Sequence, residues 1–263
     1  MIYEKTNYSA GLNYLNNTFI REYDISKANI NVLFSKGIID KRTYDYLYES
    51  ERMIRQIFVG KLIKNNNGVS DVLKQGILEA RKNLFEANDI KDYEVLSIKN
   101  DAVFIIGRVL NNTDFGLIKF ANKNQYTAFM SFMNMELYYY YNRMTEEEKL
   151  DIKGISDDKL INHEKYMLQF IKDVFYLMQT SNPINALQMV KDFYMDYINF
   201  NLPVEYYRMF NISSLYHYKA SPFMNTGFES DMVLDENKKN LDITYNLEIL
   251  KNMQKILVTM ALQ

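Results

Sequence analysis

Cysteine and tryptophan are absent from this chain of 263 residues, which also has only 2 histidines, 3 prolines and 9 glycines. Without cysteine the chain can form no disulfide framework and no thiolate metal site, and it has no thiol nucleophile. The two histidines, His163 and His217, are isolated, and we interpret each as an ordinary core or surface residue. The scarcity of glycine and proline excludes a collagen-like chain and disfavours a sandwich with many tight turns.

A dominant charge and a long apolar run are missing as well. The 31 basic and 33 acidic side chains give a net charge of −2. That balance excludes the strong positive field of a generalised nucleic-acid-binding protein, although a local basic groove is compatible with it. No apolar run is long enough to span a membrane, and the first residues lack the apolar core of a signal peptide. We therefore expect no membrane association and a cytoplasmic location.

Asparagine, lysine, isoleucine and tyrosine are abundant instead. This bias is typical of an AT-rich coding source, such as a bacterium of low GC content or its phage. For a phage protein the expected location is the cytoplasm of the host cell.

The hydrophobic pattern changes from helical to alternating and back again along the chain. Predicted strands lie at 19–25, 94–98, 102–106, 115–120, 126–130 and 135–139. Ser26 is predicted to cap a short helix with Ile30, Leu33 and Phe34 inward, and Asp40 to cap a helix that runs to about residue 64. Another predicted helix begins at Ser70, and later ones cover 157–178, 183–200 and 241–262. This order predicts an α+β fold, in which helices and a central antiparallel sheet are followed by a helical C-terminal part.

A domain boundary is predicted near Thr145. Residues 1–144 hold the predicted strands, whereas residues 145–263 are mainly helical. We interpret the charged segment that starts at Met144 as a helix-like connection between the two parts. Residues 213–240 show the least periodicity and predict an ordered loop or hairpin.

Two acidic residues, Asp24 and Asp101, occupy positions that matter for chemistry. Asp24 ends a predicted strand just before a helix, and Asp101 lies at the tip of a predicted hairpin. Taken singly, Asp24 has the ordinary interpretation of a helix N-cap and Asp101 that of a turn former. Taken together, two strand-end carboxylates on one sheet could hold Mg²⁺ (or Mn²⁺), because Mg²⁺ favours one or two carboxylates plus substrate phosphates. Two-metal phosphoryl transfer needs little more from a protein.

Residues 24–33 read Asp-Ile-Ser-Lys-Ala-Asn-Ile-Asn-Val-Leu. This run resembles the first palm motif of DNA polymerases of the DNA polymerase I family, which runs Asp, aromatic, Ser, three residues, an apolar residue, Arg and then Val-Leu. The matching positions are Asp24, Ser26, Ile30, Val32 and Leu33. Asn29 and Asn31 replace the family's Glu and Arg, which removes groups that assist substrate contacts in the full enzymes.

Residues 97–105 read Ser-Ile-Lys-Asn-Asp-Ala-Val-Phe-Ile. They are similar to the metal-binding hairpin of the third palm motif, which reads His-Asp-Glu before apolar residues in the same family. Asp101 fits that pattern, whereas Asn100 and Ala102 stand where His and Glu would be. The run is also similar to the family B hairpin, in which Thr-Asp-Ser precedes an apolar strand.

The resemblance covers roughly residues 19–106 and implies a palm-like domain in which Asp24 and Asp101 hold the catalytic metals. It implies reduced fingers, formed by helices at about residues 39–88. It also implies nucleic acid and nucleotides as partners, together with subunits that supply a missing thumb or fingers in a phage replication or transcription complex.

Three cations in the predicted fingers, Arg52, Arg55 and Lys61, are candidates for contacts with an incoming triphosphate. Arg52 and Arg55 share a helix face because they are three residues apart, and arginine binds phosphate oxygens in a bidentate manner. The alternative is a solvated charged face that includes Glu49 and Glu51.

Two other functions remain open. One is a non-catalytic, helix-rich interaction protein of a phage or bacterial complex, in which Asp24 and Asp101 need not be close. The other is a metal-dependent nuclease, because synthesis and hydrolysis use the same metals. Shared metals need carboxyl groups about 3–6 Å apart, whereas a separation above about 12 Å would remove the site.

Overall fold

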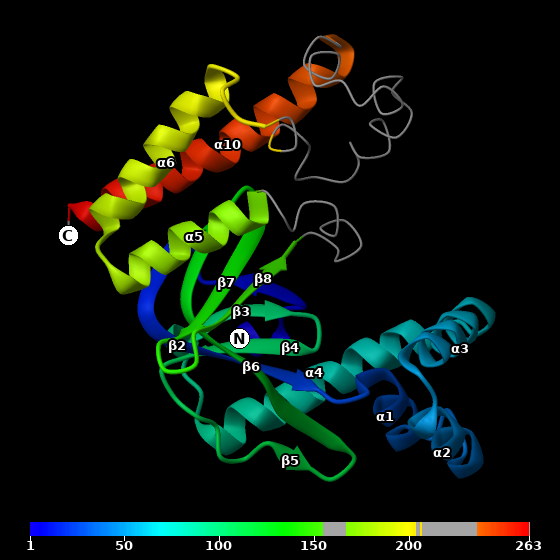
Figure 1. Ribbon diagram of the computed structural model, residues 1–263. Helices are drawn as coiled ribbons and strands as arrows, with labels where there is room; N and C mark the ends of the chain where they lie inside the picture. The colour runs from blue at the N-terminus through cyan, green and yellow to red at the C-terminus, as the bar shows by residue number, and fades with distance from the viewer. Residues whose placement is uncertain (155–166, 204–205, 207–235, 263) are drawn as a thin grey trace. The chain divides into compact units, whose positions relative to one another are not determined.

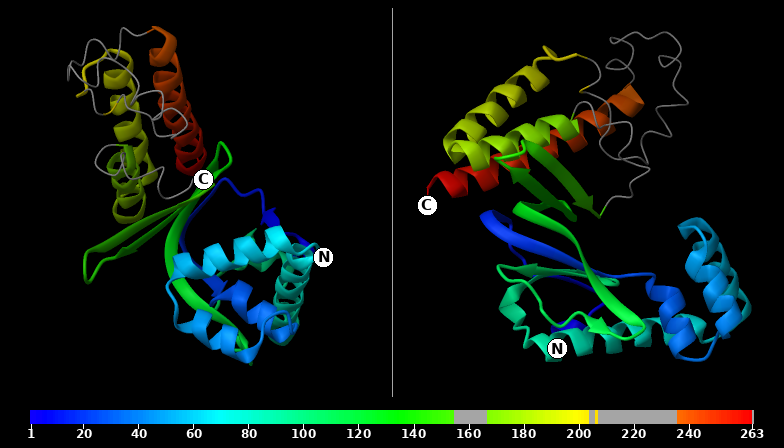
Figure 2. Two further views of the ribbon diagram at one scale, coloured as in Figure 1. Left: turned by 90° about the vertical axis from the view of Figure 1, so that its right-hand side faces the viewer. Right: turned by 60° about the horizontal axis from the view of Figure 1, so that its bottom comes forward.

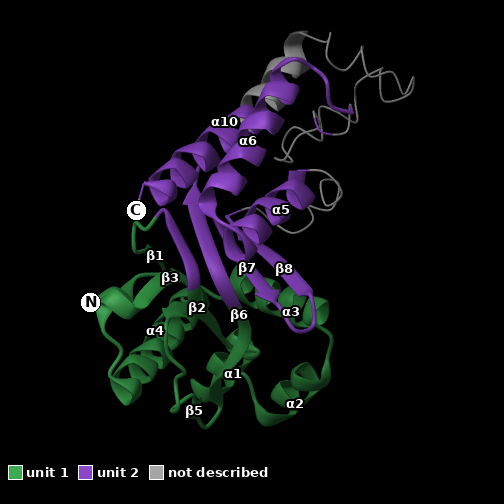
Figure 3. Cartoon of the chain, turned by 60° about the vertical axis from the view of Figure 1, so that its left-hand side comes forward, with its two compact units in different colours: residues 1–12, 18–125 green, residues 13–17, 126–263 purple. Residues whose placement is uncertain are grey.

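The computed structural model describes residues 1–154, 167–203, 206 and 236–262 (Figure 1). Contacts between residues divide the chain into two compact units, which Figure 3 distinguishes by colour. Unit 1 comprises residues 1–12 and 18–125, and unit 2 comprises residues 13–17 and 126–263. This division falls earlier along the chain than the boundary predicted near Thr145.

Unit 1 contains an antiparallel sheet with the strand order β1-β3-β4-β2-β6, and the short β5 pairs with β6. The strands are β1 (Asn7–Ser9), β2 (Tyr14–Ile25), β3 (Val95–Lys99), β4 (Ala102–Ile106), β5 (Asp114–Phe115) and β6 (Ile118–Phe132). The predicted strand at 19–25 and the predicted hairpin are confirmed. The predicted strands at 115–120 and 126–130 are largely one strand, β6, because no glycine or proline interrupts the residues between them.

Four α-helices belong to unit 1, and a short 3-10 turn precedes the first strand and another precedes β3. The helices are α1 (Ala28–Ser35), α2 (Lys41–Glu49), α3 (Arg52–Asn65) and α4 (Val69–Asn88), and the 3-10 turns are η1 (Ile2–Glu4) and η2 (Asp92–Glu94). Figure 2 shows the segments of α1–α4, blue to cyan, gathered into one group. Their buried side chains form a common apolar cluster that includes Leu33, Leu47, Val59 and Leu73.

The single helix predicted from Asp40 to about residue 64 is wrong, because the chain is extended at Ser50 and Glu51. The predicted cap at Asp40 is confirmed: its carboxylate accepts a hydrogen bond from the Thr43 amide at 2.7 Å. Nine residues later α2 ends, where the Ser50 hydroxyl donates to the Tyr46 carbonyl at 2.6 Å. Serine competes for backbone hydrogen bonds in this way, which makes it a weak residue for a helix interior.

The break also changes which residues face the core. In one continuous helix Ile54 and Ile57 would follow Leu47 at helical spacing on the apolar side, but they are 38% and 51% exposed. The predicted Ser26 cap is also wrong, because α1 starts after Lys27, which has a positive φ of 51° and no side-chain cap. The inward positions Ile30 and Leu33 of that helix are confirmed as buried, and Phe34 is partly buried against the same cluster.

Helix α4 packs on one face of the unit 1 sheet. Its residues Ala80, Leu84 and Phe85 share an apolar cluster with Tyr23 of β2 and Val103 of β4. Side chains alternate along a strand, so Glu22 and Asp24 point to the opposite face from Tyr23. The sheet therefore presents one apolar face to α4 and carries acidic residues on the other.

A glycine lets α4 approach α1 closely. A Cβ atom at Gly76 would lie 2.3 Å from Cγ1 of Val32. The side chain of any other residue would force the two helices apart or displace Val32.

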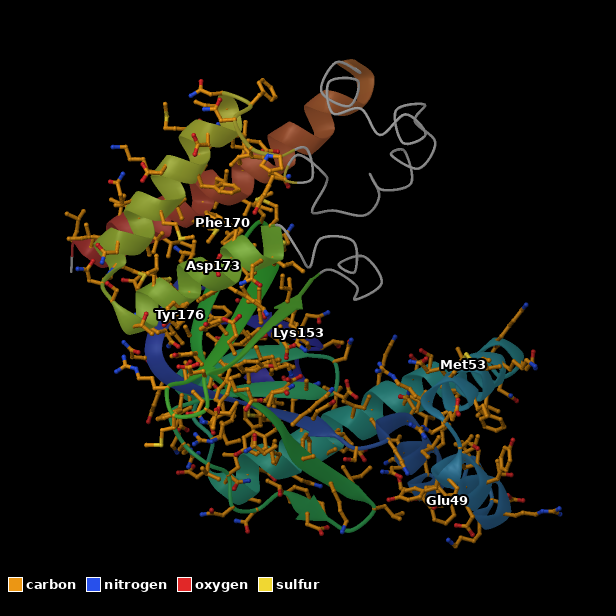
Figure 4. The ribbon with its side chains drawn as sticks, viewed as in Figure 1. Glu49, Met53, Lys153, Phe170, Asp173 and Tyr176 are labelled. Atoms are coloured by element: carbon orange, nitrogen blue, oxygen red, sulfur yellow. The ribbon has the colours of Figure 1, made fainter. Side chains whose placement is uncertain are left out.

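Unit 2 continues the antiparallel pairing with β6, β7 (Met135–Asn142) and β8 (Glu147–Lys153). Helices α5 (Met167–Thr180), α6 (Pro183–Ile198) and α10 (Glu236–Ala261) complete it. On α5, Phe175 stacks on Tyr139 at a ring distance of 5.1 Å. Figure 4 shows the side chains of α5, where Phe170 is buried in the core and Tyr176 is 41% exposed.

The helix-like connection predicted after Met144 is wrong, because residues 147–153 form strand β8. Leu150 and Ile152 alternate with charged residues at a period of two, and both pack against the core of unit 2. A strand at this position buries these residues, whereas a helix would not place them on one face.

The predicted helices at 183–200 and 241–262 are confirmed as α6 and α10. In the predicted helix at 157–178, the described part begins at Met167. Residues 157–166, most of the segment at 213–240, and both histidines lie outside the described residues. The predicted α+β class, with an antiparallel sheet and helices in the C-terminal part, is confirmed. Among the described helices, none is both long and apolar enough to cross a membrane.

Candidate functional site

Asp24 and Asp101 come together in unit 1 because of strand pairing. Asp101 follows Asn100 in the tight turn between β3 and β4, and Asn100 adopts the positive φ of 53° that such a turn needs. Strand β4 pairs with β2 in a register that sets Asp24 opposite Ala102, the neighbour of Asp101. Both aspartates consequently line one pocket of about 440 Å³.

The two carboxyl groups influence each other directly. Burial raises the pKa of Asp101, and the negative charge of Asp24 raises it further. A hydrogen bond to Asp24, which only a protonated carboxyl can donate, acts in the same direction. The two side chains are thus close enough for their charges to interact, which a shared cation would also require.

The two oxygens of the Asp24 carboxylate differ in their surroundings. Oδ1 of Asp24 is buried and accepts no hydrogen bond from the described residues, whereas Oδ2 accepts one from Nζ of Lys123 at 3.0 Å. A buried carboxylate oxygen without a donor is costly, and it is the kind of hard ligand that Mg²⁺ binds. The pair fits a magnesium ion in this respect. No group of three or more acidic or histidine side chains suited to a metal occurs in the part of the chain that the structure describes.

Arginine side chains from α3 line the same pocket. Arg52 and Arg55 are both among its lining residues, whereas Lys61 is not. Lys61 lies six residues after Arg55, about 240° further round the helix. Arg52, Glu49 and Glu51 are exposed and Arg55 is half-buried, so the alternative of a solvated charged face stays open. In Figure 4, Glu49 marks the end of α2.

Lys123 is a pocket residue that the sequence did not indicate. It lies on β6, next to β2, and its ammonium group pairs with Asp24. Burial lowers the pKa of Lys123, but the hydrogen bond to Asp24 and the charges of Asp24 and Glu22 outweigh it, so its pKa lies above the ordinary value. No sequence signal marked Lys123, because its importance depends on which strand lies beside β6.

Arg81 of α4 supports the turn that carries Asp101. Its side chain is buried and donates to the carbonyl oxygens of Tyr3 at 2.8 Å and Lys5 at 2.5 Å, and also to that of Asn100. Burial lowers the pKa of Arg81 to about 10, although the charge of Asp101 opposes this effect. The guanidinium therefore stays charged at neutral pH and ties the N-terminal segment and α4 to the hairpin turn.

The comparison with protein families gives a match along almost the whole chain. Residues 1–259 match the family model of the bacteriophage PBS1 gene 130 protein. The chain belongs to this phage protein family. No curated protein matches the chain. The compositional expectation of a phage source agrees with the family.

For this member of the gene 130 family, the chemistry open to the site follows from its charges. Two carboxylates, Asp24 and Asp101, face three cations, Arg52, Arg55 and Lys123, around one pocket. Carboxylates suit a divalent cation, and arginine and lysine suit phosphate oxygens. The arrangement can accommodate a metal-bound polyphosphate.

Proposed function

We propose that the protein is a polymerase-palm-like, Mg²⁺-dependent nucleotidyl-transfer protein, or a subunit of one, in a phage replication or transcription complex. The observation that carries this proposal is the meeting of Asp24 and Asp101 in one pocket with Arg52 and Arg55. These four residues come from β2, the β3–β4 turn and α3, which are remote along the chain. The resemblance of the first two segments to palm motifs agrees with their placement.

The residues would divide the work of phosphoryl transfer between them. Asp24 and Asp101 would hold Mg²⁺, which supplies Lewis-acid stabilisation of phosphate oxygens when it is bound. Arg52 and Arg55 would bind the phosphate oxygens and neutralise their charge, because a guanidinium matches two oxygens at once. A pocket of about 440 Å³ lies within the usual range for small ligands. Nucleic acid, and subunits that supply a thumb or further fingers, are the proposed partners.

A primer-extension assay with Mg²⁺ or Mn²⁺ tests the proposal. The wild-type protein should extend a labelled primer on a template, and Asp24→Asn and Asp101→Asn should each reduce extension by at least about 100-fold. Asp114→Asn is the matched control, because Asp114 is an exposed aspartate of β5 that pairs with Lys119 outside the pocket. The catalytic role would be overturned if the wild-type protein did not extend the primer. It would also be overturned if both Asn variants extended the primer as well as the wild type does. Shortening of the primer would assign hydrolysis instead.

A second candidate is a non-catalytic interaction protein that keeps a palm-like fold. It is favoured by the ion pair between Lys123 and Asp24, which already neutralises one carboxylate, and by the lack of a third acidic ligand among the described residues. Under this alternative, Mn²⁺ should bind no more tightly to the wild type than to Asp24→Asn. Titration calorimetry with Mn²⁺ therefore separates the two candidates.

A further inference from the structure

Lys123 is positioned to interact with both components of the proposed reaction. Its Nζ atom lies 3.0 Å from Oδ2 of Asp24, and its side chain lines the pocket that Asp24, Asp101 and Arg52 also line. The side chain is 54% exposed, so it is held at its tip rather than packed along its length. A lysine of this kind can exchange one anionic partner for another at little cost, because a half-exposed ion pair contributes little to stability.

A metal ion and Lys123 compete for the same ligand. The ammonium group occupies one oxygen of Asp24, and a divalent cation bound to that carboxylate would lie close to the ammonium charge. Like charges at such short range repel each other even in water. Metal entry should therefore drive the lysine away from Asp24.

A bound phosphate chain could become the new partner of the displaced lysine. The positive charge of Arg52 already acts on Lys123 across the pocket. Two like charges facing one cavity are stabilised together when a polyanion lies between them. A phosphate chain bound to the metal would supply that polyanion within reach of both side chains.

We infer that Lys123 is an exchangeable ligand of this site: it pairs with Asp24 in the metal-free protein and binds the phosphate chain of the substrate once a divalent cation has entered. The inference rests on the proposed function and deepens it, because it names a substrate contact that the sequence motifs do not include. It predicts opposite effects of one substitution on metal affinity and on phosphate affinity.

Titration calorimetry on the full chain tests the exchange with Mn²⁺ alone and then with inorganic tripolyphosphate at saturating Mn²⁺. Lys123→Met should bind Mn²⁺ about three- to tenfold more tightly than the wild type, because the competing charge is gone. The same variant should bind tripolyphosphate about five- to tenfold more weakly, because a charge-assisted contact is lost. Lys123→Arg keeps the charge and should behave like the wild type in both titrations.

Lys119→Met is the matched control. Lys119 lies on the same strand, is 60% exposed and pairs with Asp114 at 2.6 Å, but it does not line this pocket. It should leave both affinities unchanged. A wild type that binds Mn²⁺ and a Lys123→Met variant that matches it in either titration would overturn the exchange while leaving the metal site intact. A wild type that binds no Mn²⁺ would instead overturn the proposed metal site, and Lys123 would then be only the ion-pair partner of Asp24.

Discussion

Asp101 carries an energetic cost that its neighbours only partly relieve. Its burial and the charge of Asp24 favour the neutral form, whereas the charge of Lys123 favours the ionised form. Two carboxylates in one pocket repel each other unless a proton or a cation lies between them. Perturbed carboxyl groups of this kind cluster at functional sites, which supports a role for Asp101 beyond that of a turn former.

We predict that Asp101→Asn stabilises the metal-free protein at neutral pH. The folded-state pKa of Asp101 is raised above the ordinary 3.8, so the folded state holds this proton more strongly than the unfolded state does. The stability that this proton confers is present in acid and is lost as the pH rises through the raised pKa. Asparagine suffers no such loss and suits the turn, so the variant should melt about 1–4 °C higher at neutral pH.

Thermal unfolding at several pH values without metal provides the measurement. The difference from the wild type should shrink in acid and vanish below about pH 4. Asp114→Asn is the control with the opposite sign, because hydrogen bonds from Lys119 and Gly116 lower the pKa of Asp114. Its stabilising effect is present above pH 3.8 and is lost in acid, so the variant should lose stability at neutral pH. A lower melting temperature for Asp101→Asn at neutral pH would contradict the predicted cost.

At the scale of elements, local patterns were predictable and contacts between distant elements were not. The β3–β4 hairpin was predicted from adjacent apolar runs and turn residues, and the Asp40 cap from a single side chain. The break at Ser50 was missed because apolar residues continue at helical spacing on both sides of it. The position of Lys123 beside Asp24 depends on the pairing of β6 with β2, which links residues far apart in the sequence.

Arg81 of helix α4 binds the hairpin turn that carries Asp101 of the candidate site. Arg81 lies on the face that also carries Ala80 and Leu84, and its guanidinium serves carbonyl oxygens from the N-terminal segment and the hairpin turn. A buried guanidinium is costly to desolvate, and carbonyl groups do not neutralise its charge. This role could not be predicted from the sequence, because an arginine in an amphipathic helix normally lies in solvent.

We predict that Arg81→Met destabilises the protein and weakens the proposed metal site together. Methionine fills much of the volume but leaves buried carbonyl oxygens without donors, which should lower the free energy of unfolding by roughly 2–4 kcal/mol. Hydrogen exchange should accelerate at the turn residues Asn100 and Asp101, and Mn²⁺ affinity should fall. Arg81→Lys keeps a charged donor and should recover part of both losses.

Arg108→Met is the control for the Arg81 prediction. Arg108 also donates to backbone carbonyls, those of Asn88 and Asp89, and pairs with Glu94 at 2.8 Å, but these partners lie outside the turn that carries Asp101. Its loss should reduce stability without changing Mn²⁺ affinity. Equal loss of Mn²⁺ affinity in the Arg81 and Arg108 variants would show that general destabilisation, not support of the turn, controls metal binding.

At the scale of the whole molecule, two strands, β2 and β6, contribute residues to both units. Residues 14–17 of β2 belong to unit 2 and the rest of that strand to unit 1, and β6 passes from unit 1 into unit 2 after Gln125. Each unit has its own apolar clusters, and the strands of each unit include part of β2 and part of β6. Each unit therefore uses its own part of β2 and of β6.

We predict that the two units unfold in one cooperative transition. Phe175 is fully buried in the core of unit 2 and stacks on Tyr139 at 5.1 Å. Phe175→Ala should lower the free energy of unfolding by about 3–5 kcal/mol through the loss of buried area and the cavity left behind. If β2 and β6 couple the units, calorimetry should show a single peak that moves as a whole to lower temperature.

Mn²⁺ affinity measured well below that transition should stay unchanged, because the candidate site lies in unit 1. Two resolved peaks, of which only one moves, would show that the shared strands do not couple the units.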